Sequence, residues 1–201
     1  SGLVGSEMCI RDSDMAVLAG DKLFIYAFET AAKAFALTDR ADLVGKAISI
    51  LANKAGIYGM IGGQSVDVEY TDRPVTKSQL EFIYELKTAA LLEAAMMIGA
   101  VLAGADDNQV KSAEQIAHHV GMAFQIRDDI LDVISTTEEL GKPVKSDEKN
   151  NKTTYVTIYG LDGASKLVEE YSHTAMTLLD QVCPNASFLK RLFEYLIVRK
   201  K

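Results

Sequence analysis

Apolar positions along this chain recur every three to four residues, which is the spacing of a helix that buries one face. The pattern is clear between Asp14 and Leu37, and it returns several times before the chain ends at Lys201. Clusters of Gly, Pro and Asn separate the periodic stretches and mark turns. We therefore predict helices over residues 14–37, from 41 to about 60, from 76, over 89–105, from about 106, over 164–182 and over 187–201. This pattern predicts an all-α protein.

Three of these helices follow residues that commonly cap a helix. Thr38-Asp39 precedes the second helix, and Thr76 is followed three residues later by Gln79, which is the spacing of a capping box. Asp106-Asp107-Asn108 lies at the start of a later helix. Because the helix dipole favours carboxylates at an N-terminus, we interpret this acidic doublet as a cap and not as a metal site.

A second group of aspartates lies in a mostly apolar stretch. Asp128 and Asp132 are one helical turn apart, Asp129 adjoins Asp128, and Gln125 lies one turn before them on the same face. Apolar residues cover the rest of this helix: Phe124, Ile126, Ile130, Leu131, Val133 and Ile134. A helix that is apolar on most sides is normally buried, and buried carboxylates are costly unless something pairs with them.

Two interpretations of this acidic face are open from the helix alone. Like charges at one-turn spacing destabilise a helix by roughly 0.2–0.5 kcal/mol per pair. A hard divalent cation reverses the sign of that interaction, and Mg2+ prefers one or two carboxylates together with waters and phosphate oxygens. The alternative is a solvated acidic edge on an amphipathic helix, because DDxxD is a short pattern.

Lysines near this helix favour the first interpretation. Gly141-Lys142-Pro143 marks a loop just after the aspartates, and Lys142 and Lys152 are two of four lysines within eleven residues of it. Upstream, Lys87-Thr88 interrupts an apolar run, and a buried lysine needs an anionic partner such as a phosphate. A cationic loop beside an anionic face suits a ligand that has both phosphates and metal ions.

A polar pair follows two glycines in the segment from residue 61 to 70. Gln64 and Asp67 are three residues apart and share a face, and Gly62-Gly63 permits a close backbone approach or a kink. From spacing alone, this pair is equally explained as an exposed polar edge near a helix end.

Five stretches in order along the chain resemble the trans-polyprenyl diphosphate synthases, and most closely the bacterial farnesyl (geranyl) diphosphate synthases. They are DMAVLAGD (14–21), GGQSVDVE (62–69), KTAALL (87–92), GMAFQIRDDILDV (121–133) and GKPVKSDEKNNKTTYVT (141–157). The resemblance covers about Asp14 to Lys201. Tyr84 and Ala89 depart from the histidine and the glycine that are common at these positions of the family.

The resemblance implies the isoprenoid synthase fold, an all-α bundle around a central cavity. It also implies a Mg2+-dependent prenyltransferase that condenses an allylic diphosphate with isopentenyl diphosphate by ionisation, condensation and elimination. Farnesyl diphosphate is the expected product, although the residues that set chain length are not in this sequence. The implied partners are small prenyl diphosphates and a second copy of the full-length chain in a homodimer.

The motifs also imply roles for particular residues. Those expected to hold Mg2+ are Asp128, Asp129 and Asp132. Those expected to bind the allylic diphosphate are Lys87, Thr88, Gln125, Lys142 and Lys152, and the resemblance assigns catalysis to Lys87, Asp128 and Lys142. Gln64 and Asp67 are expected to line the cavity behind these groups.

The first aspartate-rich motif of the family is absent, as is its arginine pair. Residues 1–13, SGLVGSEMCIRDS, have no helical period, and we expect a non-native or unstructured leader. Residues 14–201 are then the C-terminal two-thirds of a polyprenyl synthase domain that lacks its N-terminal helices, and we expect this stretch to be inactive alone. Three alternatives are a non-catalytic subunit of a heteromeric prenyl diphosphate synthase, a terpene cyclase of the same fold and a helical interaction protein. The Gly141-Lys142-Pro143 loop argues against a cyclase.

Composition narrows the partners. A chain of 201 residues that is 48% hydrophobic has enough apolar residues for one domain with a sizeable core. The net charge of −7 argues against nucleic acid as a partner. Cys9 and Cys183 form no disulfide framework, which favours a cytoplasmic protein. The most apolar stretch, residues 89–105, contains Glu93 and is shorter than the ~20 residues that a membrane span needs.

Overall fold

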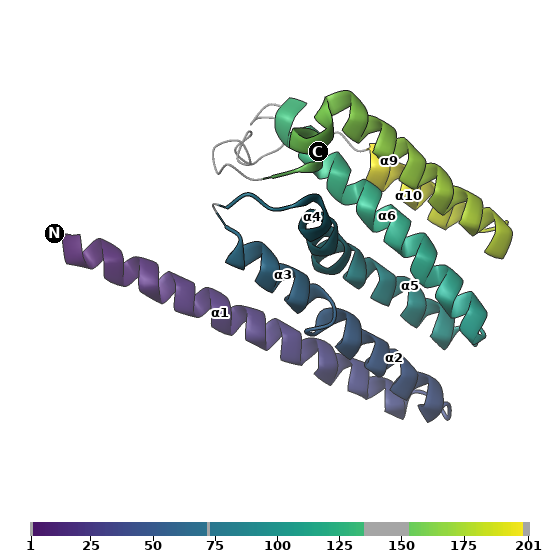
Figure 1. The fold of residues 1–201 in the computed structure, drawn as a ribbon. Helices are drawn as coiled ribbons and strands as arrows, with labels where there is room; N and C mark the ends of the chain where they lie inside the picture. The colour runs from purple at the N-terminus through teal and green to yellow at the C-terminus, as the bar shows by residue number, and fades with distance from the viewer. Residues whose placement is uncertain (1, 72, 135–152, 199–201) are drawn as a thin grey trace. The chain divides into compact units, whose positions relative to one another are not determined.

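The computed structural model describes residues 2–71, 73–134 and 153–198, with side chains from Asp14 to Ile197. These described ranges contain helices and no strand, so the all-α prediction is confirmed (Figure 1). The chain divides into two compact units, Ser1–Ile48 and Ser49–Lys201. In the ranges described, no helix is both long enough and apolar enough to cross a membrane.

The first unit consists of helix α1 (Gly2–Ala32), the short 3-10 turn η1 (Lys33–Ala36) and the first part of α2 (Ala41–Ala55). The apolar side chains of Met15, Leu18 and Leu23 are exposed. Helix α1 also contains residues 2–13, where the sequence predicts a non-native or unstructured leader. The boundary of that leader at residue 13 stays a prediction.

The second unit contains the rest of the helices. They are α3 (Met60–Glu69), α4 (Lys77–Tyr84), the π-helical turn η2 (Glu85–Ala89), α5 (Ala90–Leu102), α6 (Asp107–Ile134), α9 (Tyr155–Val182) and α10 (Ser187–Val198). Helix α6 lies between α5 and α9 and packs against both (Figure 1). It is buried on most sides, because Ile116, Val120 and Ile126 all belong to the core. The expectation that the acidic stretch lies on a buried helix is therefore confirmed.

Helix boundaries follow the caps more closely than the apolar period. Thr76 accepts a hydrogen bond from the Gln79 backbone N–H, and the Gln79 side chain accepts one from the Thr76 N–H, which confirms the predicted capping box. Helix α2 ends at Ala55, short of the predicted residue 60, because Gly56 and a turn to Gly59 interrupt it.

The helix predicted from residue 164 begins earlier, at Tyr155, after a second capping box formed by Thr154 and Thr157. A kink at Gly160, where φ is 70°, lets the two helical segments run on as α9.

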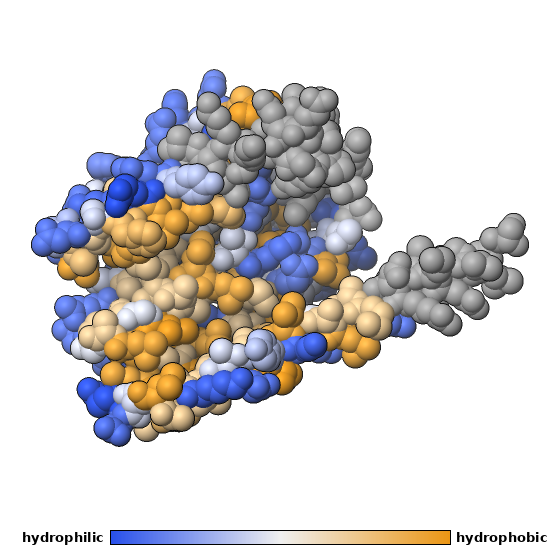
Figure 2. All heavy atoms as spheres, turned by 180° about the vertical axis from the view of Figure 1, so that it is seen from behind, coloured by the Kyte–Doolittle hydropathy of each residue, from blue (hydrophilic) through white to orange (hydrophobic). Residues whose placement is uncertain are grey.

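Apolar residues form broad patches on the face of the molecule that Figure 2 shows. Exposed apolar side chains of the second unit include Ile57, Tyr58 and Val68.

Candidate functional site

An ion pair joins α3 to the turn η2. The Lys87 ammonium lies 2.5 Å from a carboxylate oxygen of Asp67, and the two side chains are partly buried, at 33% and 17% exposed. Gly63 makes this pair possible, because a Cβ atom there would lie 2.4 Å from the Lys87 backbone nitrogen. The close approach predicted for the two glycines is therefore found at Gly63.

A second polar contact joins η2 to α6. The Thr88 hydroxyl donates a hydrogen bond of 2.8 Å to the side-chain oxygen of Gln125. Gly121 lies one turn before Gln125, and a Cβ atom there would lie 2.6 Å from the Ala89 Cβ. The absence of a side chain at Gly121 therefore lets α6 approach η2 closely enough for the two polar groups to meet.

The turn η2, which is π-helical, contains both Lys87 and Thr88. Short π-helical turns inside α-helices are uncommon, and they occur frequently at functional sites. Here the turn directs Lys87 to α3 and Thr88 to α6, so two consecutive side chains reach two different helices. The structure thus brings together four residues predicted from sequence: Asp67, Lys87, Thr88 and Gln125.

The three aspartates lie in the last turns of α6. Asp129 and Asp132 are each only 4% exposed, and Asp128 is half-buried. None of the three is turned outward into bulk solvent, so the simple solvated edge does not describe this face. Asp129 accepts hydrogen bonds from the Tyr84 hydroxyl at 2.7 and 2.8 Å and from the Tyr155 backbone N–H at 3.0 Å.

The carboxylates of this turn are oxygen ligands of the kind that Mg2+ takes. Among the described side chains, no group of three or more His, Cys, Asp or Glu residues is arranged to hold a metal ion unaided. This donor set still fits Mg2+, which commonly uses one or two carboxylates and completes its shell with waters and substrate phosphates. Asp128 and Asp132, one helical turn apart, would supply such ligands.

An open cavity of about 650 Å³ lies beside the Lys87 side chain. Its lining consists of Met60, Ile61, Gln64, Ser65, Val68 and Lys87. Gln64 therefore faces the same space as Lys87, as the sequence predicts for a cavity-lining residue. Lys142 and Lys152, the two predicted ligands from the loop, lie outside the described residues.

Sequence reasoning did not find the residues that hold Asp129. From the sequence, Tyr84 is only a departure from the histidine common at that position of the family, and Tyr155 has no predicted role. Their contacts with Asp129 span 45 and 26 residues, so no local spacing indicates them. The sequence offers only a weaker indication of these contacts. A buried carboxylate needs hydrogen-bond donors, and tyrosine hydroxyls are among the few side-chain donors that an apolar helix offers.

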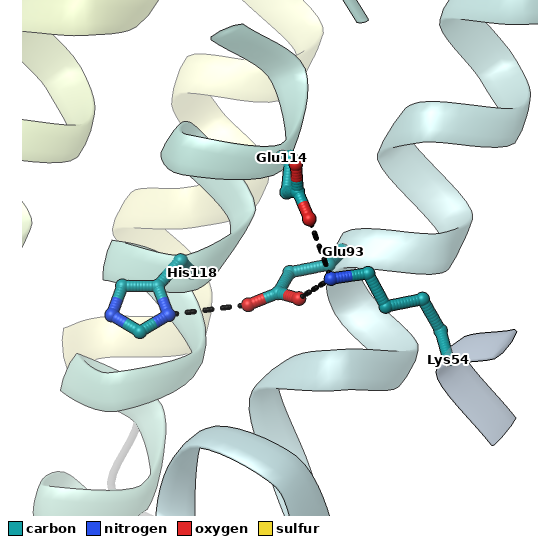
Figure 3. A network of polar contacts seen from close by, with 4 residues as sticks. All are labelled: Lys54, Glu93, Glu114 and His118. Carbon is teal, nitrogen blue, oxygen red and sulfur yellow. Dashed lines mark hydrogen bonds and ion pairs between the residues drawn. The ribbon is translucent and has the colours of Figure 1, made fainter. Parts of the chain in front are cut away.

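A second polar network lies on α2, α5 and α6 (Figure 3). The Lys54 ammonium binds Glu93 at 2.5 Å and Glu114 at 2.6 Å, and His118 Nδ1 lies 3.2 Å from the other oxygen of Glu93. Burial disfavours the charge on Lys54, but hydrogen bonds and attraction from Glu114 and Glu93 outweigh it and raise the pKa of Lys54.

The hydrogen bond with Glu93, which outweighs burial, likewise raises the pKa of His118 above its usual 6.5. The network therefore explains how a carboxylate can be buried in the apolar helix α5, because Glu93 has Lys54 and His118 as partners.

Residues 7–185 match the family model described as polyprenyl synthetase. A farnesyl diphosphate synthase of Geobacillus stearothermophilus is 37% identical over 185 residues, which are 92% of this chain and 62% of that protein. A geranylgeranyl diphosphate synthase of Cyanophora paradoxa is 42% identical over 161 residues, 80% of this chain and 53% of that protein. The chain thus spans less than two thirds of the length of these relatives.

Solved structures agree with the sequence comparison. The geranyltransferase of Helicobacter pylori, determined in complex with magnesium and isoprenyl diphosphate, superposes with a TM-score of 0.76 at 33% identity. The match covers 90% of this chain and 59% of that chain. The all-α fold and the family that the five sequence motifs indicate are therefore confirmed. The chain belongs to the polyprenyl synthetase family of prenyltransferases.

Proposed function

We propose that the protein condenses an allylic diphosphate with isopentenyl diphosphate and releases farnesyl diphosphate. The observation that supports this proposal is that Lys87 pairs with Asp67, while its neighbour Thr88 donates to Gln125 one turn before the acidic face of α6. Cationic and hydroxyl donors then lie near carboxylates that can hold Mg2+, which is the combination that a metal-bound diphosphate requires.

In the proposed reaction, the bond between the allylic carbon and the diphosphate oxygen breaks, and the electron pair leaves with the diphosphate. The alkene of isopentenyl diphosphate attacks the resulting cation and forms the new carbon–carbon bond. The cation that this produces then loses a proton to the released diphosphate, which restores a double bond. When bound, Mg2+ supplies Lewis-acid stabilisation of the leaving diphosphate. Lys87 adds a fixed positive charge at the same leaving group, and the Thr88 hydroxyl orients it.

The resting site is arranged for the arrival of an anion. Lys87 is paired with Asp67, and Thr88 with Gln125, so the diphosphate ligands are held in place before substrate binds. Groups fixed in this way lose little freedom when they stabilise developing charge. We propose that Lys142 and Lys152 join them as further ligands of the diphosphate, and that Asp128, Asp129 and Asp132 hold the metal.

The cavity beside Lys87 suits the hydrocarbon part of the substrate. Met60, Ile61 and Val68 supply apolar walls, while Gln64 and Lys87 supply polar groups at the same opening. A carbocation is hydrolysed by any water that reaches it, so apolar walls near the ionising carbon protect the reaction. We also propose that the working protein is a homodimer.

The test is incorporation of labelled isopentenyl diphosphate by a full-length parent protein that contains these residues. Asp128→Ala is expected to lower turnover at least ~100-fold, in line with the loss of a charge-stabilising group. The matched control is Asp106→Asn, which removes a carboxylate at the other end of α6 where Asp106 accepts a cap hydrogen bond of 2.9 Å from the Gln109 N–H. Asparagine keeps that cap, so the control is expected to retain turnover. Wild-type kinetics for Asp128→Ala would overturn the assignment.

A further inference from the structure

The Asp129 carboxylate has an unusual partner at the end of α4. The hydroxyl of Tyr84, the last residue of that helix, lies 2.8 Å from one carboxylate oxygen and 2.7 Å from the other. Tyr84 is 3% exposed and Asp129 4%, so water does not compete for this contact. Hydrogen bonds to charged groups are stronger than those between neutral groups, and a buried carboxylate that loses its donor is left with an uncompensated charge.

The same carboxylate also holds the start of α9. The Tyr155 backbone N–H donates to Asp129 at 3.0 Å, directly after the cap residue Thr154. The rings of Tyr84 and Tyr155 lie 5.2 Å apart and pack against each other. Asp129 therefore joins three elements: the end of α4, the last turns of α6 and the first turn of α9.

The two tyrosines differ in one respect that a mutation can isolate. Tyr155 is as deeply buried as Tyr84, at 2% exposed, but its hydroxyl has no hydrogen-bond partner among the described residues. Removing the Tyr155 hydroxyl deletes an unsatisfied polar group, whereas removing the Tyr84 hydroxyl deletes a donor to Asp129. The chain thus provides a matched control within the same aromatic pair.

We propose that Tyr84 is a positioning residue whose hydroxyl fixes the Asp129 carboxylate and, through it, the orientation of the acidic turn of α6. The inference rests on the proposed function, in which that turn faces Mg2+ and a diphosphate. Tyr84 also immediately precedes η2, so one residue links the turn that holds Lys87 and Thr88 to the helix that holds the aspartates.

The expected effect follows from how metal ligands are held. Carboxylates that bind a metal are oriented by hydrogen bonds from groups behind them, and losing such a group typically lowers metal affinity about 10–100-fold. Tyr84→Phe keeps the ring and its packing against Tyr155, so the change is confined to the hydroxyl. Tyr155→Phe makes the same chemical change one ring away without touching the carboxylate.

The first experiment titrates inorganic pyrophosphate into the protein by calorimetry at a series of Mg2+ concentrations. Tyr84→Phe is expected to raise the Mg2+ concentration for half-maximal binding about 10–100-fold. Tyr155→Phe is expected to change it less than about threefold, since its hydroxyl contacts no ligand-bearing group. A purely structural role for Tyr84 would lower the melting temperature and leave the Mg2+ requirement unchanged, and that result would overturn the proposal.

The second experiment is independent of any ligand. Hydrogen exchange of peptides that cover residues 126–134 is compared in the two variants without Mg2+. Faster exchange in Tyr84→Phe than in Tyr155→Phe supports the positioning role of Tyr84, and equal exchange overturns it. If the wild-type protein binds no pyrophosphate with Mg2+, the proposed function fails, and this comparison alone decides the role of Tyr84.

Discussion

Replacing Lys54 with methionine removes the cation that joins Glu93 to Glu114 and roughly keeps the length of the side chain. Lys54 lies 2.5 Å from Glu93 and 2.6 Å from Glu114, and its side chain is 17% exposed (Figure 3). The variant leaves two carboxylates of α5 and α6 close together, with the His118 ring still beside Glu93. Stability is therefore expected to fall.

The size of the loss follows from burial. Removing one partner of a fully buried ion pair costs about 3–5 kcal/mol, because the other charge stays buried and unpaired. Glu93 is nearly buried at 9% exposed, but Glu114 is 34% exposed and regains solvation. Because only one of the two carboxylates stays buried, the expected loss is about 2–3 kcal/mol, below that range. For a chain of this length that corresponds to a drop in melting temperature of roughly 5–10 °C.

The assay is thermal and urea unfolding followed by circular dichroism. The matched control is Lys77→Met, which breaks an exposed pair of 3.7 Å with Glu81. Surface pairs contribute about 0–1 kcal/mol, so this control is expected to lower the melting temperature by no more than about 3 °C. If Lys54→Met is no more destabilising than Lys77→Met, the assignment of a stabilising network to Lys54 is wrong.

Two further predictions concern close packing and pH. Gly63→Ala is expected to lower the free energy of unfolding by about 1–3 kcal/mol and to weaken pyrophosphate binding, because its Cβ would lie 2.4 Å from the Lys87 backbone nitrogen. The control is Gly99→Ala, where nothing lies within 4 Å of the added Cβ, and it should stabilise α5 by about 0.5–1 kcal/mol. Glu93 stabilises the protonated His118 ring and so raises the pKa of His118. The difference in unfolding free energy between wild type and His118→Gln is therefore expected to be largest below pH 6.5 and to shrink as pH rises through that raised pKa. A difference that grew with pH would contradict that assignment.

The sequence predicted the parts of the fold that depend on neighbouring residues. The apolar period located α6, and the Thr76–Gln79 capping box located the start of α4. The same local reasoning failed where glycines decided the outcome: α2 ends at Ala55 before Gly56, and α9 continues across Gly160. A period indicates which face is buried, but it does not state where a backbone will turn.

In the candidate site, too, the sequence predicted individual residues but not the contacts between distant segments. The motifs pointed to Lys87, Thr88 and Gln125, and the structure brings Thr88 to Gln125. The partner of Lys87 in the absence of substrate is Asp67, on a different helix. Contacts of this kind, like those of Asp129 with Tyr84 and Tyr155, join segments far apart in sequence and depend on how the helices pack.

The most direct measurement of the proposed site is thermal unfolding of the protein with a bisphosphonate, a stable analogue of pyrophosphate, in the presence and absence of Mg2+. Lys87, Thr88, Gln125 and the acidic turn of α6 are proposed to hold a diphosphate only together with the metal. At a ligand concentration of 100 times Kd, stabilisation is expected to reach about 2.7 kcal/mol. The melting temperature should then rise by roughly 5–10 °C with both components and return to its starting value when EDTA removes the metal. An unchanged melting temperature with Mg2+ and bisphosphonate together would contradict the site.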